Sequence, residues 1–319
     1  LTGNAPGNDM RFHYERVESS RNFANKIWNA SRFILMNLKD TVPKKPDKEE
    51  LELPDRWIIS KYNRLVQEVT ENLEKYELGI AVQKLYDFIW SEFCDWYIEL
   101  AKPRLYDQEN EQQRETVLYT LTYVLSNSLK LLHPFMPFIT EEIWQHLPHE
   151  GDSIMISPWP EYNENEVDAE AEDQMEAIMN AIRSIRNVRA EMEVHPSQKA
   201  QVIIVPSQGY KDVFEEGKIY FERLAYASKL VLKNSEADIP ENSVSIVTDK
   251  AQLFMPLEDL VDFDKEMKRL NKEKDTLEKE IRRANGKLSN ENFVKKAPSA
   301  VVEGERQKLQ KYHEMMDKV

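Results

Sequence analysis

The sequence predicts a mainly α-helical protein with a helical bundle, a small α+β junction domain and a C-terminal antiparallel coiled-coil arm. Only 8 of its 319 residues are glycine, and none lies between Gly7 and Gly79, so that stretch needs elements without left-handed backbone, which means helices. After Pro196 the helical spacing gives way to short β-branched runs. From Leu257 onward apolar residues repeat every seven positions, which is typical of a coiled coil.

The bundle is predicted over residues 19–160. Apolar residues recur there at three- and four-residue steps in five segments, which predicts five amphipathic helices with short connections. Ser19 or Ser20 is a favoured N-cap for the first helix and Asp55 for the second, and residues 1–18 are expected to be irregular. The predicted helices span residues 19–38, 55–76, 78–100, 109–132 and 137–144.

Residues 161–256 are predicted to be a linker helix and a small α+β domain. Residues 161–176 hold eight carboxylates and no Lys or Arg, and they lead into a helix whose apolar face reaches Met192. The β-branched runs that follow predict short strands, with one helix between the first two. The predicted strands span residues 202–205, 231–232, 244–247 and 253–255, and the helix spans residues 213–227.

Residues 257–319 are predicted to form the arm. Leu260 and Ile281 share one heptad position, and Leu277 fills the second position of the apolar seam. The pattern stops within residues 285–298 and a second apolar run follows, so we expect two helices that pair as an antiparallel hairpin.

Composition excludes several classes of protein. No run approaches the ~20 apolar residues of a membrane span, and the first residues lack both a signal peptide and an initiator Met, so we expect a piece of a longer protein. The single cysteine, Cys94, fits a reducing cytoplasm, and its aromatic neighbours predict a packed thiol rather than a nucleophile. One cysteine and six histidines cannot supply a zinc site, so no metal is expected, and His146 and His149 are interpreted as a surface pair. No motif for a self-contained catalytic site occurs, so no catalytic residue is predicted.

Charge is distributed unevenly along the chain. The net charge of −14 by itself argues against nucleic acid, whose phosphates attract cations. However, residues 265–296 carry eleven Lys or Arg against six Asp or Glu, and residues 21–64 carry ten against six. Because salt screens fields within ~10 Å, RNA needs a local basic face rather than a basic average. A solvated coiled-coil surface is the alternative interpretation of the arm cations.

Two groups of cations are candidates for contact with RNA phosphates. On the helix that ends near Met192, Arg183 points away from the apolar face and Arg186 flanks it. Arg189 lies near the centre of that face, which predicts a structural ion pair. The candidate phosphate-binding residues are Arg183, Arg186, Lys268, Arg269, Lys272, Lys279, Arg282, Arg283 and Lys287.

Several runs of residues resemble the anticodon-binding bundle of the class I aminoacyl-tRNA synthetases. These are FANKIWNASRF at 23–33, DRWIIS at 55–60, FIWSEFCDWYIE at 88–99, HPFMPFITEEIW at 133–144 and IRNVRAE at 185–191. The run LSNENFVKKAP at 288–298, set inside a terminal coiled coil, is most similar to the valyl-tRNA synthetase family. Leucyl and isoleucyl relatives share the bundle and differ after it.

The resemblance implies a function and a partner. In that family the bundle reads the anticodon, the arm packs on the outer corner of the L-shaped tRNA, and the enzyme attaches valine to its tRNA with ATP. The chain lacks the His-Ile-Gly-His and Lys-Met-Ser-Lys-Ser motifs that bind ATP, and it lacks the editing domain, so this portion is expected to use no cofactor and to be inactive alone. Residues 1–18 resemble the end of the catalytic region. We expect valine tRNA as the partner and a monomer in the cytoplasm.

The basic edge of the bundle supplies candidates for reading the anticodon. Single-stranded bases stack on aromatic or Arg planes and form hydrogen bonds through their edges. Trp28 and Trp57 lie beside apolar stripes, so a core position is the alternative for both. Two other functions stay open: a coiled-coil scaffold for another protein chain, and the equivalent portion of a leucyl or isoleucyl enzyme. The candidate anticodon-binding residues are Lys26, Trp28, Arg32, Trp57, Lys61 and Arg64.

Overall fold

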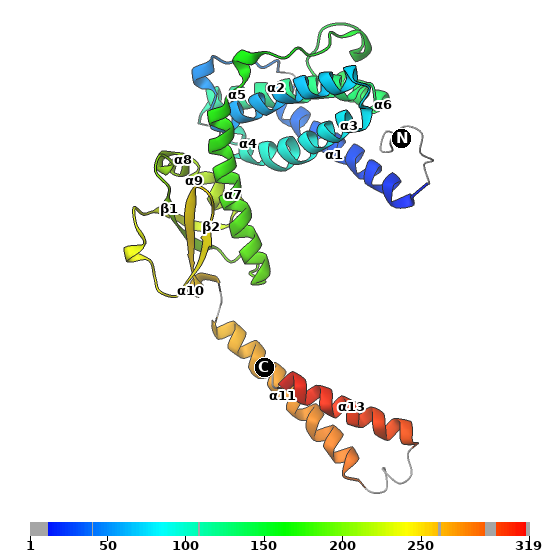
Figure 1. Ribbon diagram of the computed structural model, residues 1–319, viewed down its shortest axis with the longest axis vertical. Helices are drawn as coiled ribbons and strands as arrows, with labels where there is room; N and C mark the ends of the chain where they lie inside the picture. Colours follow the sequence, from blue (N-terminus) through cyan, green and yellow to red (C-terminus); the bar gives the residue numbers. More distant parts are fainter. Residues whose placement is uncertain (1–11, 40, 108, 261–262, 291–297, 317–319) are drawn as a thin grey trace.

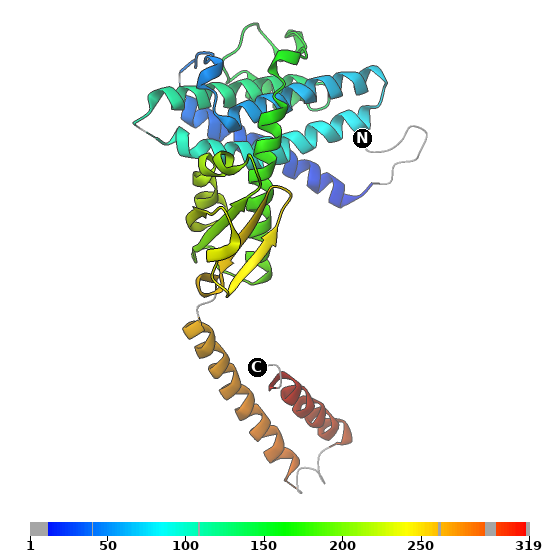
Figure 2. The same cartoon turned by 60° about the vertical axis from the view of Figure 1, so that its left-hand side comes forward.

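The computed structural model describes residues 12–39, 41–107, 109–260, 263–290 and 298–316, and the side chains of 238, 263–270, 273, 299 and 300 fall outside that description. A helical bundle, an α+β domain and a helical hairpin follow one another along the chain (Figure 1). The hairpin extends away from the other two parts in both views (Figure 2). The prediction of a mainly α-helical protein with a small α+β part is confirmed.

The bundle buries one continuous apolar core. Ile34, Trp57 and Leu121 come from three different helices and are at most 1% exposed. The second helix is surrounded by others, because the helical segments over residues 78–87, 88–97, 111–132 and 169–191 and the short turn at 164–166 all pack against it. The elements are α1 (Tyr14–Leu38), α2 (Leu53–Glu74), α3 (Leu78–Asp87), the π-helical segment η2 (Phe88–Tyr97), α4 (Ile98–Leu105), α5 (Glu111–Leu132) and α6 (Pro137–Trp144), followed by α7 (Ala169–Glu191).

Two helices begin earlier than predicted. Residues 14–18 belong to α1 and are not irregular. Ser19 and Ser20 do not cap this helix, because their hydroxyls donate hydrogen bonds of 2.9 Å to carbonyl oxygens one turn back. Asp55 is the third residue of α2 rather than its cap. Its carboxylate accepts a hydrogen bond of 3.1 Å from the backbone N–H of Glu52, and this stabilises the first turn from inside the helix.

The single helix predicted over residues 78–100 consists of three consecutive segments, α3, η2 and α4. At the end of η2 the backbone N–H of Ile98 reaches back five residues to the carbonyl oxygen of Phe93. Pro103 lies inside α4 and does not end the helix. Apolar spacing does not reveal a π turn, because the turn shifts the hydrogen bonds by one residue while the same side chains stay buried.

The α+β domain packs a four-stranded mixed sheet beside α7. The strand order is β2-β1-β4-β3, with β1 and β2 parallel and the other pairs antiparallel. The single helix predicted between the first two strands is two helices that meet at Gly217, where a Cβ would lie 2.9 Å from the Cδ1 of Ile178. Glycine therefore permits the close approach of α7. The elements are β1 (Ala200–Pro206), α8 (Lys211–Glu216), α9 (Lys218–Leu224), β2 (Ala227–Leu232), β3 (Ser243–Val247) and β4 (Ala251–Pro256).

The arm is a hairpin of two antiparallel helices, α11 (Phe263–Leu288) and α13 (Ser299–Met316), preceded by the short α10 (Leu257–Leu260) (Figure 1). Leu277, Ala284 and Val302 are 5%, 3% and 8% exposed, so the apolar seam is buried between the two helices. The break begins later than predicted, because α11 continues through Gly286. The part of the predicted break at residues 291–297 lies outside the described residues.

Candidate nucleic-acid interface

The six residues predicted to read the anticodon do not form one surface. Trp57 is 1% exposed and lies in the core of the bundle, so its ring has no face to offer a base. Lys61 pairs with Glu92 at 2.9 Å, and Arg64 pairs with Glu172 at 2.7 Å. Both cations therefore already have a carboxylate partner within the chain.

Lys26 is also engaged. Its Nζ lies 2.6 Å from a carboxylate oxygen of Asp95 and 3.8 Å from the centre of the Trp90 ring. Both partners come from η2, so this side chain fastens α1 to the π-helical segment. Because the Asp95 carboxylate offsets its charge and the Trp90 ring covers one side of it, this ammonium group attracts an RNA phosphate less than an unpaired lysine does.

Trp28 and Arg32 differ from the other four candidates. Trp28 is 46% exposed, so the core position considered for it is wrong. Arg32 is exposed one turn further along α1, and it has no hydrogen bond or ion pair among the residues that the structure describes. The apolar face of α1 runs through Phe23, Ile27 and Ile34, which leaves these two residues on the outer side of the helix.

A groove between α1 and α6 brings these two residues together. Its volume is about 510 Å³. On the α6 side lie Glu142 and His146, and Phe138, which the sequence reasoning did not single out, is 89% exposed one turn before Glu142. Phe138, Glu142 and His146 are spaced four residues apart, so they lie on one face of a helix, and this spacing could have identified that face from the sequence. The residues that line the groove are Trp28, Ser31, Arg32, Leu35, Met36, Glu142, Ile143 and His146.

Carboxylates of the acidic segment, residues 161–176, pair with basic side chains of α2. Glu172 accepts the ion pair from Arg64, and Asp168 accepts one of 2.9 Å from Arg56. Glu172 also accepts a hydrogen bond from the Ser60 hydroxyl. Two of the eight carboxylates of residues 161–176, Asp168 and Glu172, thus pair with basic residues of α2 and offset their charge.

The three arginines of α7 act mainly within the protein. Arg183 pairs with Glu176 at 2.9 Å, and its guanidinium lies 5.2 Å from the centre of the Trp96 ring. Arg186 lies 5.8 Å from the same ring and donates a hydrogen bond to the Leu224 carbonyl oxygen at 2.5 Å. Arg186 therefore links the bundle to the α+β domain, although the residue stays exposed, whereas Arg183 links α7 to the bundle.

The structural ion pair predicted for Arg189 is wrong. The residue is 4% exposed, and it donates hydrogen bonds to the carbonyl oxygens of Gln198 at 2.6 Å and His195 at 3.3 Å. Its guanidinium also lies 5.5 Å from the centre of the Tyr226 ring. No carboxylate pairs with it among the described residues, and burial lowers the pKa of Arg189 from its ordinary value. Two carbonyl dipoles and a ring face take the place of the expected anion.

The arm carries several exposed cations. The side chains of Arg282 and Arg283 are 75% and 67% exposed, and their partners among the described residues, Glu278 and Glu280, belong to the same helix. Lys272 and Lys279 are exposed as well. Lys287 is different, because it pairs across the hairpin with Glu305 at 3.1 Å and so holds α11 against α13. Lys268 and Arg269 belong to α11, but their side chains fall outside those described.

Other reactive side chains show no sign of a catalytic or metal site. Burial raises the pKa of the Cys94 thiol to about 12, so this cysteine is no nucleophile near neutral pH. His146 and His149 do not share a site, because His149 stacks on Trp144 at 3.8 Å and His146 bonds to the Glu142 carbonyl oxygen. In the described ranges, no three of His, Cys, Asp and Glu gather as metal ligands. No helix in those ranges has the length and apolar character needed to cross a membrane.

Known proteins resemble the chain over its whole length. Residues 55–204 match the family described as the anticodon-binding domain of tRNA ligase, and residues 262–319 match the family described as the valyl tRNA synthetase tRNA binding arm. Proteins named valine–tRNA ligase are 56% identical over the whole chain in Clostridium acetobutylicum, 48% identical over 98% of it in Carboxydothermus hydrogenoformans, and 46% identical over the whole chain in Oceanobacillus iheyensis. The chain spans 36%, 35% and 36% of the lengths of these curated relatives.

A solved structure is also similar, but weakly. It is a chain of the ternary complex of Agrobacterium radiobacter LeuRS with tRNA and LeuAMS, and the similarity covers 50% of this chain and 18% of that one. The TM-score is 0.38 at 20% sequence identity, which is too low to carry an argument about fold or function.

Proposed function

Because the chain belongs to the anticodon-binding family of tRNA ligases over residues 55–204 and to the valyl tRNA synthetase arm family over residues 262–319, we propose that it is the tRNA-binding portion of a valine–tRNA ligase. The bundle contacts the anticodon of valine tRNA, and the hairpin contacts the outer corner of the same molecule. The whole enzyme joins valine to that tRNA with ATP in the cytoplasm. This portion contributes binding rather than chemistry.

The groove between α1 and α6 carries the proposal for the bundle. Trp28 is an exposed aromatic ring that lines this groove, and such rings stack on bases that leave the helical stack of a loop. Phe138 is a second exposed ring on α6, one turn before Glu142, but it is not among the lining residues. Arg32 is exposed and has no partner among the described residues, so it can donate hydrogen bonds to a base edge or a phosphate. The α6 side of the groove lies inside the family match at 55–204, and the α1 side precedes it.

The arm contributes affinity in this proposal. Arg282 and Arg283 present two cations on the exposed face of α11, where they can contact the RNA backbone without reading its sequence. The rival function, a coiled-coil scaffold, is less well supported. The described seam residues Leu277, Ala284 and Val302 are already buried within the hairpin, so these three are not available to pair with another chain. For the same reason we infer a monomer.

A binding titration tests the proposal. The purified chain is titrated with valine tRNA and with the same tRNA carrying a changed anticodon, each at several salt concentrations. We expect tighter binding to the natural anticodon, by about tenfold or more when one base no longer stacks. Equal affinity for both tRNAs would refute the proposal that the bundle contacts the anticodon. A concentration-dependent dimer with no affinity for tRNA would support the scaffold instead.

A further inference from the structure

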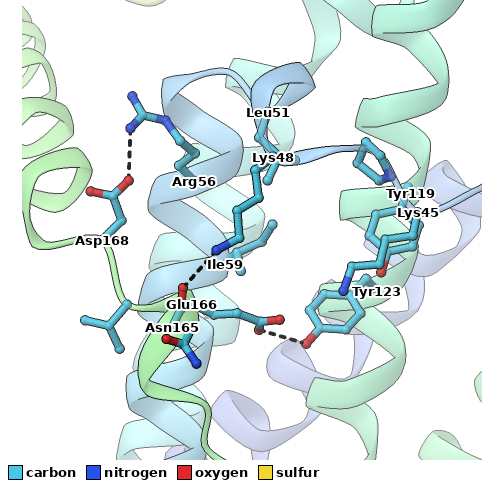
Figure 3. Close-up of a pocket in the computed structure, with 12 residues that line it drawn as sticks. Lys45, Lys48, Leu51, Arg56, Ile59, Tyr119, Tyr123, Asn165, Glu166 and Asp168 are labelled. Atoms are coloured by element: carbon cyan, nitrogen blue, oxygen red, sulfur yellow. Dashed lines mark hydrogen bonds and ion pairs between the residues drawn. The ribbon is translucent and has the colours of Figure 1, made fainter.

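A second hollow lies on the bundle, between the link from α1 to α2, the middle of α5 and the segment before α7 (Figure 3). Its volume is about 200 Å³, which is of the size of one flat aromatic group. None of its lining residues belongs to the groove between α1 and α6. The residues that line it are Lys45, Pro46, Lys48, Leu51, Arg56, Ile59, Tyr119, Tyr123, Asn165, Glu166, Val167 and Asp168.

The walls of this hollow suit a planar ligand. Tyr119 and Tyr123 lie one turn apart on α5 with their ring centres 5.8 Å apart and their planes within 10° of parallel. Leu51 and Ile59 add an apolar surface from the α2 side (Figure 3). Aromatic walls of this kind favour a flat ring, because stacking is strong for any planar base.

The charges of the hollow suit an anion. Arg56 is balanced by Asp168 at 2.9 Å. Lys48 has only a long hydrogen bond of 3.4 Å to the carbonyl oxygen of Asn165, and Lys45 has no hydrogen bond or ion pair among the described residues. Both lysines are exposed at the rim, and their ammonium groups reach toward the hollow from two sides (Figure 3). Two cations against the one remaining carboxylate leave a positive balance.

Glu166 gives the hollow a specific acceptor. Its carboxylate lies beside the Tyr123 hydroxyl, which donates a hydrogen bond of 3.4 Å to it (Figure 3). That long bond leaves most of the acceptor capacity of the carboxylate unused. A carboxylate in this position accepts from an exocyclic amino group and repels a carbonyl oxygen.

We propose that this hollow binds a nucleotide whose base carries an exocyclic amino group, with the base against Tyr119 and Tyr123, the amino group donating to Glu166, and the phosphate contacting Lys45 and Lys48. The proposal does not depend on RNA binding by the groove between α1 and α6. The nucleotide is either free or part of an RNA chain, and the experiment separates these two sources.

Cytidine and uridine monophosphate are the matched probes, because they differ in an amino group against a carbonyl oxygen at the same ring position. Calorimetric titration of the whole chain is expected to show CMP binding about tenfold more tightly than UMP, the size of one good hydrogen-bonded base contact. The double variant Lys45→Met/Lys48→Met is expected to weaken CMP by about tenfold or more. Lys44→Met, which removes a single lysine charge next to the hollow, is the control and is expected to change little.

The variant Glu166→Gln tests the base contact. An amide can donate to the carbonyl of uracil as well as accept from the amine of cytosine, so the preference for CMP over UMP is expected to fall toward one. No binding of either nucleotide at millimolar concentration, or equal affinity of the double lysine variant and the unchanged chain, would overturn the site. An unchanged preference in Glu166→Gln would overturn the base contact.

Competition with a cytidine trinucleotide identifies the source. If it displaces CMP from the unchanged chain, the site accepts a nucleotide within RNA. If CMP binds and the trinucleotide does not displace it, the site takes the free nucleotide. Because CMP binding is measured without tRNA, loss of nucleotide binding and loss of tRNA binding are separate results.

Discussion

Asp55 and Arg104 form a buried bidentate ion pair that joins the first turn of α2 to the end of α4. The carboxylate of Asp55 accepts hydrogen bonds of 2.5 and 2.8 Å from Arg104 and one of 2.7 Å from the Tyr97 hydroxyl. Asp55 is fully buried and Arg104 is 7% exposed. Burial opposes the charge of Arg104, but the adjacent carboxylate outweighs this and raises the pKa of Arg104 above its ordinary value.

Breaking this pair is predicted to destabilise the bundle strongly. Arg104→Met leaves the Asp55 charge buried without its partner, and such a loss costs about 3–5 kcal/mol of unfolding free energy. Urea unfolding followed by circular dichroism measures the difference. The control is Glu68→Gln, which breaks the exposed pair with Lys84 and is expected to cost under about 1 kcal/mol. An Arg104→Met variant as stable as the control would contradict the prediction.

The exposed ring of Trp28 is predicted to determine affinity for the natural anticodon. Trp28→Ala removes a stacking surface, and stacking of a base on an aromatic ring contributes about 1–3 kcal/mol. Filter binding is expected to show about a tenfold loss with the natural tRNA and a smaller loss with a changed anticodon. Lys61→Ala serves as the control, because its charge is already paired with Glu92. Equal losses with both tRNAs would show that Trp28 does not contact the anticodon.

The cations of the arm are predicted to act through phosphates. The double variant Arg282→Ala/Arg283→Ala leaves about two phosphates without a cation, so the slope of log affinity against log salt is expected to flatten by roughly 0.9 for each of these phosphates. Selectivity between anticodons is expected to stay the same, because binding to phosphates carries no sequence information. An unchanged salt slope would refute the assignment. Lys229→Ala, which removes one exposed cation from the sheet, is the comparison variant.

The Cys94 thiol is predicted to resist alkylation in the folded protein. Burial raises its pKa to about 12, whereas an unfolded cysteine has a pKa of about 8.5. At pH 8 the folded chain is expected to react with iodoacetamide far more slowly than the chain in urea, as measured by mass spectrometry. Rapid modification of the folded chain would contradict the burial.

The same shift in the pKa of Cys94 predicts a dependence of stability on pH. The pKa of Cys94 is higher in the folded chain than in the unfolded chain. The contribution of the buried thiol to the unfolding free energy is therefore fully present below about pH 8.5. It is lost as the pH rises toward 12, because only the unfolded thiol ionises in that window. Unfolding free energies measured across this range are expected to fall less steeply in Cys94→Ser, which has no thiol to titrate. Identical slopes for both proteins would exclude the effect.

Local pattern was enough to predict most helices, because burying one apolar face depends on residues a few positions apart. The seam residue Leu277 and the buried Ile27 of α1 were recognised in this way. The same pattern could not separate Trp28 from Trp57. Each lies next to a buried Ile in sequence, yet α2 is surrounded by helices on several sides while this part of α1 borders an open groove.

The sequence by itself therefore determined the helical bundle, the mixed α+β part, the heptad seam of the arm and the resemblance to tRNA ligases. Only the tertiary structure decided which cations are available to RNA. The partners of Arg64 and Lys61 are Glu172 and Glu92, which lie far away along the chain. Two opposite charges offset each other only where they lie close together in space, and counting charges along the sequence does not reveal the distance between them.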